Sequence, residues 1–213
     1  VKNGRWEKLN VNRTKHITDN LEATFRYKPE PGEYYMYADF KDGEQEGVVR
    51  SWETIVKYKY ENGKRIKKTY TYMDYEANYS EGLLNGPYST FYYNGKPKYS
   101  AHLSMGRLDG RAEHFDEEGR MSDFATWHLD SLNGPYGEFY EGKKTVEANF
   151  EKNKLEGKYS AYSRKNQQLI LEVTAQNNIM KNKKLFFVFN EMSILFLFQK
   201  NCFSFLNKNC FTR

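Results

Sequence analysis

The sequence has little of what marks several large classes of protein. Its two cysteines in 213 residues exclude a disulfide scaffold or a cysteine-rich zinc protein. The one long apolar segment, residues 185–198, is shorter than the roughly 20 residues of a membrane-spanning helix and contains Asn190 and Glu191. The start has no basic segment followed by an apolar one, so we expect no signal peptide, and cytoplasmic and cell-envelope locations both stay open.

The patterns of common catalytic and metal sites are missing as well. The four histidines stand apart from one another and from the cysteines, without the spacing of a metal site. The glycines precede neither a nucleophilic serine nor a predicted helix, so a nucleophile elbow and a phosphate loop are excluded. We therefore expect no cofactor, no metal and no enzymatic activity. An enzyme that holds glycans on exposed aromatic side chains is a further alternative.

Aromatic side chains are abundant, and they form two populations. The 18 Tyr, 15 Phe and 3 Trp argue against a disordered chain. Residues 183–213 hold eight of the Phe, both Cys and no Gly, with five cationic side chains against Glu191. Most of the net charge of +5 therefore belongs to this tail. For that reason we do not read the charge as a nucleic-acid signature, and a nucleic-acid partner is not expected.

An internal repeat organises the body of the chain. A Leu-x-Gly signature recurs with Gly-to-Gly spacings of 24, 24 and 23 residues. Its leucines and glycines are Leu84, Gly86, Leu108, Gly110, Leu132, Gly134, Leu155 and Gly157. Seven and five residues before each leucine stand an alanine and a large apolar residue, namely Ala77, Tyr79, Ala101, Leu103, Ala125, Trp127, Ala148 and Phe150. Two and five residues after the glycines follow mostly aromatic positions: Tyr88, Phe91, Ala112, Phe115, Tyr136, Phe139, Tyr159 and Tyr162.

Each repeat reads as one β-hairpin. Residues 87–93 and 96–104 alternate in polarity, and Asn94-Gly95 between them suits a tight type I′ turn. Asn85-Gly86 and Asp109-Gly110 are predicted to make the same turn at the opposite end. Pairing across Asn94-Gly95 sets Tyr88 against Ala101. The small residue at position 101 is explained by packing, because a large ring needs a small cross-strand partner. Phe91 then lies on the other face unless a bulge intervenes. The sequence predicts an all-β fold, an elongated antiparallel β-meander of repeated hairpins with a period of 23–24 residues.

The pattern Tyr-x-x-Phe-Tyr-x-Asn-Gly-Lys from Tyr88 to Lys96, followed by Gly-x-Leu-x-Gly from Gly106 to Gly110, resembles the MORN-repeat variant of bacterial proteins. Such proteins are often labelled antitoxin components of toxin–antitoxin systems. The resemblance implies a twisted β-meander that serves as a binding or scaffold surface without catalytic residues. MORN repeats in general are also linked with membrane-associated assemblies and lipid binding. Ala112, Glu118-Gly119 and Gln45 depart from the pattern.

These observations divide the chain into three parts. Residues 1–22 are an N-terminal lead-in, residues 23–182 the repeat array, and residues 183–213 a tail outside the repeat fold. Residues 169–173 read as the return strand of the last unit, which has no later glycine. The tail has three interpretations: a cap on the array, a membrane-surface anchor, or translated sequence beyond the original reading frame. We favour the third, because neither strand nor helix periodicity is clean there.

One hairpin is longer than the others. The spacing from Gly47 to Gly86 is 39 residues, which predicts an inserted hairpin at about 53–74 with its turn at Asn62-Gly63. Pairing across this turn places lysines on one face and tyrosines with cations on the other. The candidate binding residues are Lys57, Tyr58, Lys59, Tyr60, Lys64, Arg65, Lys67 and Lys68.

Two interpretations of the long hairpin stay open. Basic residues interleaved with aromatics suit an anionic partner, whereas lysines on an exposed strand also serve solubility and deter edge pairing. Our first hypothesis for the chain is a non-enzymatic repeat protein that binds another protein, with a toxin among the candidates. The alternative is a membrane-associated scaffold that contacts anionic lipid through the basic hairpin or the tail.

Overall fold

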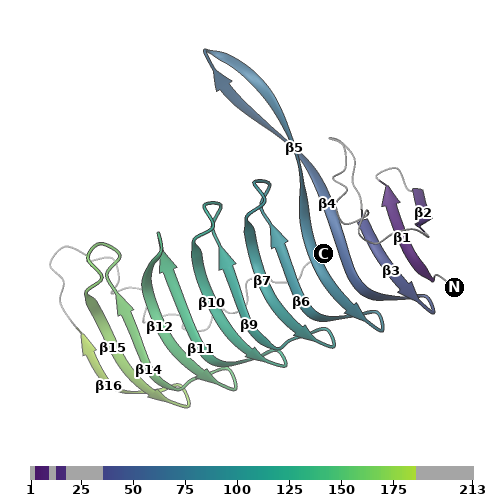
Figure 1. Cartoon of the computed structure of the whole chain (residues 1–213). Coiled ribbons are helices and arrows are strands. Elements are labelled where there is room, and N and C mark those ends of the chain that lie inside the picture. Colours follow the sequence, from purple (N-terminus) through teal and green to yellow (C-terminus); the bar gives the residue numbers. More distant parts are fainter. Residues whose placement is uncertain (1–2, 10–12, 18–35, 186–213) are drawn as a thin grey trace.

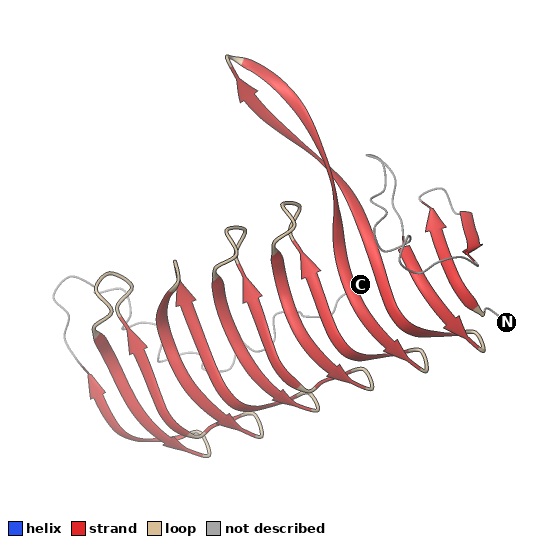
Figure 2. Cartoon of the chain, in the orientation of Figure 1, coloured by secondary structure: helices blue, strands red, loops and turns tan. Residues whose placement is uncertain are grey.

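The computed structural model describes residues 3–9, 13–17 and 36–185. These residues form one open sheet of antiparallel strands, and no described residue is helical (Figure 1, Figure 2). The predicted fold class is confirmed: the protein is an elongated antiparallel β-meander of successive hairpins. Within the described part of the chain there is accordingly no helix long and apolar enough to cross a membrane.

The strands follow one another along the sheet in nearly the order of the sequence. They are β1 (Gly4–Leu9), β2 (Arg13–Ile17), β3 (Met36–Lys41), β4 (Glu44–Glu61), β5 (Lys64–Ser80), β6 (Leu83–Phe91), β7 (Pro97–Ser104), β8 (Arg107–Leu108), β9 (Gly110–Phe115), β10 (Met121–His128), β11 (Ser131–Tyr140), β12 (Lys143–Glu151), β13 (Lys154–Leu155), β14 (Gly157–Tyr162), β15 (Leu169–Gln176) and β16 (Ile179–Leu185). The exception is the N-terminal edge, where the order is β3-β1-β2. The strands β1 and β2 both lie within residues 1–22, which were predicted as a lead-in before the array. Part of that segment therefore belongs to the sheet.

Two rows of turns border the sheet (Figure 1). We call those at the lower edge of Figure 1 the corner turns and those at the upper edge the tip turns. Both central residues of every corner turn have positive φ, as a type I′ turn requires. The corner turns are Asp42-Gly43, Glu81-Gly82, Met105-Gly106, Leu129-Asp130, Lys152-Asn153 and Asn177-Asn178.

The glycines of the Leu-x-Gly signature do not make these turns, so that part of the sequence prediction is wrong. Gly86, with φ of 110°, lies inside β6, where the strand pairing skips residues as the chain leaves the corner. There it sits directly opposite Leu103 of the next strand. Gly110 faces Trp127 and Gly134 faces Phe150 in the same way. The glycine is required because the chain bends beneath a large side chain with a positive φ.

Alternating alanines and tyrosines form the packed interior of the sheet. Tyr88 lies between Ala77 and Ala101, as predicted, and Tyr136 lies between Ala125 and Ala148. Ala77, Ala101 and Ala148 are buried. The large apolar residues pair with the signature leucines across the corner turns: Tyr79 with Leu84, Leu103 with Leu108, Trp127 with Leu132 and Phe150 with Leu155. One strand face thus buries small and large side chains in alternate rows.

A bulge does intervene beside Phe91. The pairing shifts between Thr90 and Phe91, and similar shifts flank Phe139 and Tyr162. Asn94-Gly95 is not the predicted type I′ turn, because only Gly95 has positive φ. Gly95 N–H instead donates to Tyr92 O at 2.8 Å, and Tyr92 N–H donates to Lys96 O at 2.8 Å. A type I turn followed by a left-handed glycine fits this longer connection.

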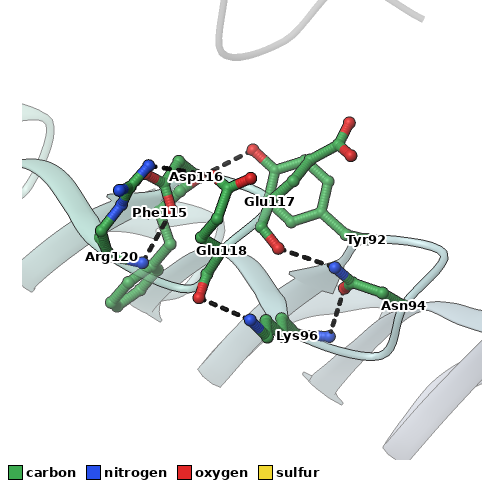
Figure 3. Close-up of polar contacts among 8 residues, drawn as sticks. All are labelled: Tyr92, Asn94, Lys96, Phe115, Asp116, Glu117, Glu118 and Arg120. Atoms are coloured by element: carbon green, nitrogen blue, oxygen red, sulfur yellow. Dashed lines mark hydrogen bonds and ion pairs between the residues drawn. The ribbon is translucent and has the colours of Figure 1, made fainter. Parts of the chain in front are cut away.

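Two neighbouring tip turns, residues 92–96 and 116–120, are hydrogen-bonded to each other at the upper edge. Figure 3 shows the Tyr92 hydroxyl donating to Phe115 O, Asn94 Nδ2 donating to Glu117 O and Lys96 Nζ donating to Glu118 O, at 2.7, 2.7 and 2.6 Å. Asp116 and Glu118 are themselves ion-paired with Arg120. These two hairpins are therefore joined at their tips as well as along their strands.

The last described unit keeps the geometry without the glycine. The predicted return strand is β15, and Asn182 stands at the glycine position of the following β16. Its φ of 49° shows that asparagine takes the left-handed conformation there. All seven residues of β16 are exposed, which makes it an open sheet edge. Residues 186–213, on which the interpretations of the tail depend, lie outside the described residues.

Candidate binding surface

The long hairpin projects beyond the row of tip turns (Figure 1, Figure 2). We define the arm as residues 56–69, the ends of β4 and β5 with their connecting turn. β3 pairs with β4 only as far as Ser51, and β6 pairs with β5 only as far as Tyr75. Among the described strands, the two strands of the arm therefore pair only with each other. No described strand therefore pairs with the backbone N–H and C=O groups on either outer edge of the arm.

Local sequence explains why the arm forms. Asn62 and Gly63 have φ of 52° and 74°, so this turn does have the type I′ geometry whose twist matches two antiparallel strands. The register runs without interruption from Glu61 opposite Lys64 down to Trp52 opposite Met73. At its base, the Thr54 and Thr71 hydroxyls lie 2.9 Å apart across the strands. The predicted pairing of the arm is confirmed.

At the base of the arm, the pKa values of Tyr72 and Asp74 are raised. The Tyr72 hydroxyl donates to Glu53 Oε2 at 2.9 Å, and burial together with that carboxylate raises the pKa of the tyrosine. Burial, with a smaller contribution from Glu53, also raises the pKa of Asp74, while Lys98 opposes the shift. Asp74 is the unpaired residue of the bulge between Tyr75 and Met73. The strands that lead into the arm thus contain a bulge. Beside it lie the hydrogen-bonded Tyr72 and the half-buried Asp74.

Alternation along the strands gives the arm two faces. The lysine face consists of Lys57, Lys59, Glu61, Lys64, Ile66 and Lys68. The aromatic face consists of Val56, Tyr58, Tyr60, Arg65, Lys67 and Thr69. The eight predicted binding residues all lie on the arm, but they divide between these two faces.

Much of the lysine face is engaged within the protein. Glu61 Oε1 lies 3.2 Å from Lys68 Nζ and 3.3 Å from Lys59 Nζ. The hydrogen bond from Lys68, followed by that from Lys59, lowers the pKa of Glu61. Lys57 Nζ lies 3.3 Å from the centre of the Tyr93 ring, a cation–π contact with the next tip turn. Three of the four predicted lysines on this face therefore already have partners.

Tyr93 and Tyr70 are the residues of this surface that sequence reasoning missed. Their rings meet edge to face with centroids 5.2 Å apart. Tyr93 belongs to the turn between β6 and β7, so it braces the lysine face of the arm from the neighbouring hairpin. An aromatic pair of this kind contributes about 0.5–1.5 kcal/mol beyond its buried area. The bracing orients the arm and leaves its other face uncovered.

The aromatic face is exposed at all six positions. Tyr60 is 72% exposed and Tyr58 53%, high values for residues with large rings. The Arg65 guanidinium lies 3.8 Å from the centre of the Tyr58 ring, which pre-orders both side chains. Arg65 and Lys67 give this face two cations, and none of its residues is acidic.

The arm also concentrates positive charge. Residues 57–68 contain Lys57, Lys59, Lys64, Arg65, Lys67 and Lys68 against Glu61 alone, six cations minus one anion, or +5. The whole chain carries the same net charge of +5. All residues outside this segment therefore sum to zero, because the +4 of residues 183–213 is offset by −4 on the remaining residues, and within the described part of the chain the arm is a local positive site.

Two histidine–carboxylate pairs lie elsewhere on the sheet. His114 Nδ1 is 2.7 Å from Asp123 Oδ1, and His128 Nδ1 is 3.0 Å from Asp109 Oδ1. Both pairs link adjacent strands or units. In the described part of the chain, no group of three His, Cys, Asp or Glu side chains is placed to hold a metal ion. The arm is therefore the surface with the clearest potential for binding.

Comparison of the chain with protein-family models found no match, and a search of curated protein sequences found none either.

Proposed function

We propose that this protein is a non-enzymatic repeat protein that binds another protein through the aromatic face of its arm. The observation that carries the proposal is the exposure of all six neighbouring residues on one face, two of them tyrosines. A folded protein gains nothing in stability from leaving such rings in water, because burying an apolar side chain is favourable by about 1.5–3 kcal/mol. Exposed apolar patches of this kind mark interaction sites.

The composition of the aromatic face suits a protein partner. Tyr58, Tyr60 and Arg65 are residue types that dominate the binding energy of protein interfaces. Their pre-ordering by the Arg65–Tyr58 contact lowers the entropy lost on association. The resemblance to MORN-repeat variant proteins supports the same class of function, and a toxin neutralised by the bound arm is one candidate partner.

The charge of the arm favours a second candidate, contact with an anionic membrane surface. Its net +5 would attract acidic headgroups by about 1 kcal/mol per cation near the surface. The tip of the arm, however, is Glu61-Asn62-Gly63-Lys64, which offers no apolar side chain for insertion between lipids. We therefore rank this candidate second.

The experiment that tests the proposal begins with photo-crosslinking. A benzophenone amino acid replaces Tyr60 in the full chain, and the crosslinked protein is identified by mass spectrometry and then purified. Its affinity is measured calorimetrically for the wild type and for the double variant Tyr58→Ser/Tyr60→Ser. We expect affinity to fall at least about tenfold, since two interface tyrosines are lost.

The matched control is Tyr140→Ser, which removes a tyrosine that is 45% exposed on the array rather than on the arm. It should leave affinity unchanged. Equal affinities for the arm variant and the wild type would refute the proposal. Sedimentation of the full chain with phosphatidylserine vesicles, abolished by the charge change Lys64→Glu/Lys67→Glu but not by the tyrosine variant, would favour the membrane candidate instead.

A further inference from the structure

We infer that the arm captures an extended acidic segment of its partner, which adds as a strand to the free edge of β5 beside Arg65 and Lys67. This inference rests on the proposed function and specifies the chemistry of the partner. Three observations carry it: an unpaired strand edge, the spacing of cations along that edge, and the absence of acid from the aromatic face.

The edge is available over the outer half of β5. Residues 64–69 of β5 pair with β4 on one side, and no described strand pairs with them on the other. Six residues match the usual length of a strand in a sheet. An added strand would satisfy the exposed N–H and C=O groups of this edge, the mode of recognition by which extended peptides join sheets.

The charges along the edge specify the side chains of the added strand. Arg65 and Lys67 are two residues apart on the aromatic face, and Thr69 continues the row. An extended peptide repeats its side chains at the same interval, because every second residue points to the same face. Carboxylates at alternate positions would therefore lie directly beside both cations, at about 4.5–5.5 Å between Cβ atoms.

Tyr58 and Tyr60 extend the proposed binding surface onto β4, the strand that pairs with β5. Tyr60 is directly opposite Arg65, and Tyr58 is directly opposite Lys67. Both rings lie on the same face as the row of cations. Long or apolar side chains of the partner that reach past Arg65 and Lys67 would meet these rings. The edge thus provides backbone pairing, and the aromatic face provides side-chain contacts.

The same cations explain why the edge would not pair with a second copy of the arm. Two β5 edges placed together bring Arg65 and Lys67 of each copy against one another, and like charges directly opposite are destabilising. An acidic strand removes that penalty and replaces it with attraction. Arg65 and Lys67 therefore disfavour pairing between two copies of the β5 edge and favour pairing with an acidic strand.

Nucleic acid fits these observations less well than an acidic protein segment. Phosphate binding would depend on the lysine face, where Lys59 and Lys68 already bond to Glu61 and Lys57 packs on Tyr93. The aromatic face has only two cations, of which Arg65 already stacks on Tyr58, whereas tight binding to a phosphate backbone uses several.

The test uses the full chain and fluorescein-labelled synthetic peptides in fluorescence anisotropy. The probe peptide alternates glutamate and valine over eight residues between Gly-Ser ends. A second peptide replaces each glutamate by lysine, and a third is the acidic peptide with every second backbone nitrogen methylated. We expect the acidic peptide to bind at least about tenfold more tightly than either comparison peptide, because they lack charge complementarity and backbone donors respectively.

Two charge-reversed proteins separate the aromatic face from the net charge of the arm. Arg65→Glu/Lys67→Glu should weaken binding of the acidic peptide about tenfold or more and create binding of the lysine peptide. Lys57→Glu/Lys59→Glu changes the net charge equally on the lysine face, and we expect less than about a threefold effect because screening weakens distant charges.

Three results would overturn the inference: absence of acidic-peptide binding, equal binding of the methylated peptide, or equal effects of the two charge reversals. Binding to a duplex DNA or to phosphatidylserine vesicles in preference to the acidic peptide would also overturn it. The proposed function is tested by a different measurement, the effect of Tyr58→Ser/Tyr60→Ser on affinity for the crosslinked partner. The proposed function and this inference can therefore fail separately.

Discussion

Asn153 and Leu132 hold each other by two hydrogen bonds across neighbouring corner turns. Asn153 N–H donates to Leu132 O at 2.9 Å, and Leu132 N–H donates to Asn153 Oδ1 at 2.7 Å. Asp130 makes the same pair of bonds with Leu108, and Asn178 makes it with Leu155. Earlier in the array, Gly82 and Gly106 donate to Gln45 O and Leu84 O, and the residues before them, Glu81 and Met105, donate their N–H groups to Glu46 Oε2 and Asn85 Oδ1. Each of these corner turns is therefore bonded to the preceding unit both through the backbone and through a side chain, and in the three C-terminal turns that side chain belongs to the second turn residue.

We predict that Asn153→Gly lowers the free energy of unfolding by about 1 kcal/mol, the usual contribution of one hydrogen bond. Asn153→Ala should cost about 2 kcal/mol, because alanine also lacks the polar side chain through which asparagine tolerates the left-handed φ of 65°. Urea unfolding followed by circular dichroism measures both values. If the glycine variant is as stable as the wild type, the side-chain bond to Leu132 contributes nothing.

The meander and its pairing could be predicted because they depend on local information. The strands were predicted from the alternation of polar and apolar side chains, and the hairpins from the 24-residue period. The register of the arm was predicted from the position of its turn at Asn62-Gly63. The corner turns could not be predicted correctly. Lys152-Asn153 and Leu129-Asp130 lack glycine, and the nearby Gly157 and Gly134 looked like turn residues although they bend strands.

The residues that pack against the arm could not be predicted from the sequence either. The eight basic and aromatic candidates could be listed, and their division between two faces followed from the pairing. Which face is covered depends on Tyr93, which is 36 positions beyond Lys57 in the chain and approaches it only through the twist of the sheet. No local pattern encodes that contact, so the exposure of the aromatic face had to come from the structure.

Gly134→Ala should be more damaging than Gly142→Ala, although both glycines have positive φ, 125° and 76°. A Cβ on Gly134 would lie 3.0 Å from Thr126 Cβ, whereas one on Gly142 meets nothing within 4 Å. We expect a loss of about 1 kcal/mol for Gly142→Ala and about 3 kcal/mol for Gly134→Ala, since overpacking adds to backbone strain. Equal losses in thermal or urea unfolding would contradict the close approach at the bend.

Gly137→Ala tests packing without backbone strain, because Gly137 does not have a positive φ. Its Cβ would lie 2.6 Å from Phe124 Cε1 on the facing strand. The Phe124 ring cannot move freely, since it contacts Phe139 at 6.2 Å between centroids and Arg111 at 3.7 Å. We expect a loss of about 2 kcal/mol from overpacking.

Phe124→Leu supplies the control for Gly137→Ala. In the leucine background the added methyl group has room, so the alanine substitution should cost less than about 1 kcal/mol. A double-mutant cycle from urea unfolding gives the coupling energy between the two positions. Additive losses would show that the ring is not what requires glycine at position 137.

Glu61 should titrate below its usual range, because hydrogen bonds from Lys68 and then Lys59 favour its charged form. A lowered pKa in the folded state means that Glu61 stabilises the arm above the unfolded pKa of about 4.3, and that this contribution disappears as the pH falls through the folded pKa. Lys68→Met should raise the pKa of Glu61 more than Lys59→Met does. Carboxyl chemical shifts measured between pH 2 and 7 report both, and a Glu61 pKa unchanged by Lys68→Met would contradict the pairing.

Shortening the arm should separate binding from folding. Removal of residues 57–60 and 65–68 joins Val56 to Glu61 and Lys64 to Thr69, which keeps the turn and the alternation of faces. The deleted residues contact the rest of the array mainly through Lys57 on Tyr93. We therefore expect one cooperative melting transition within about 2–4 °C of the wild type, the shift that about 1 kcal/mol produces in a domain of 150–250 residues. Binding of the crosslinked partner should be lost. A shortened protein that still binds with full affinity would place the binding surface elsewhere on the sheet.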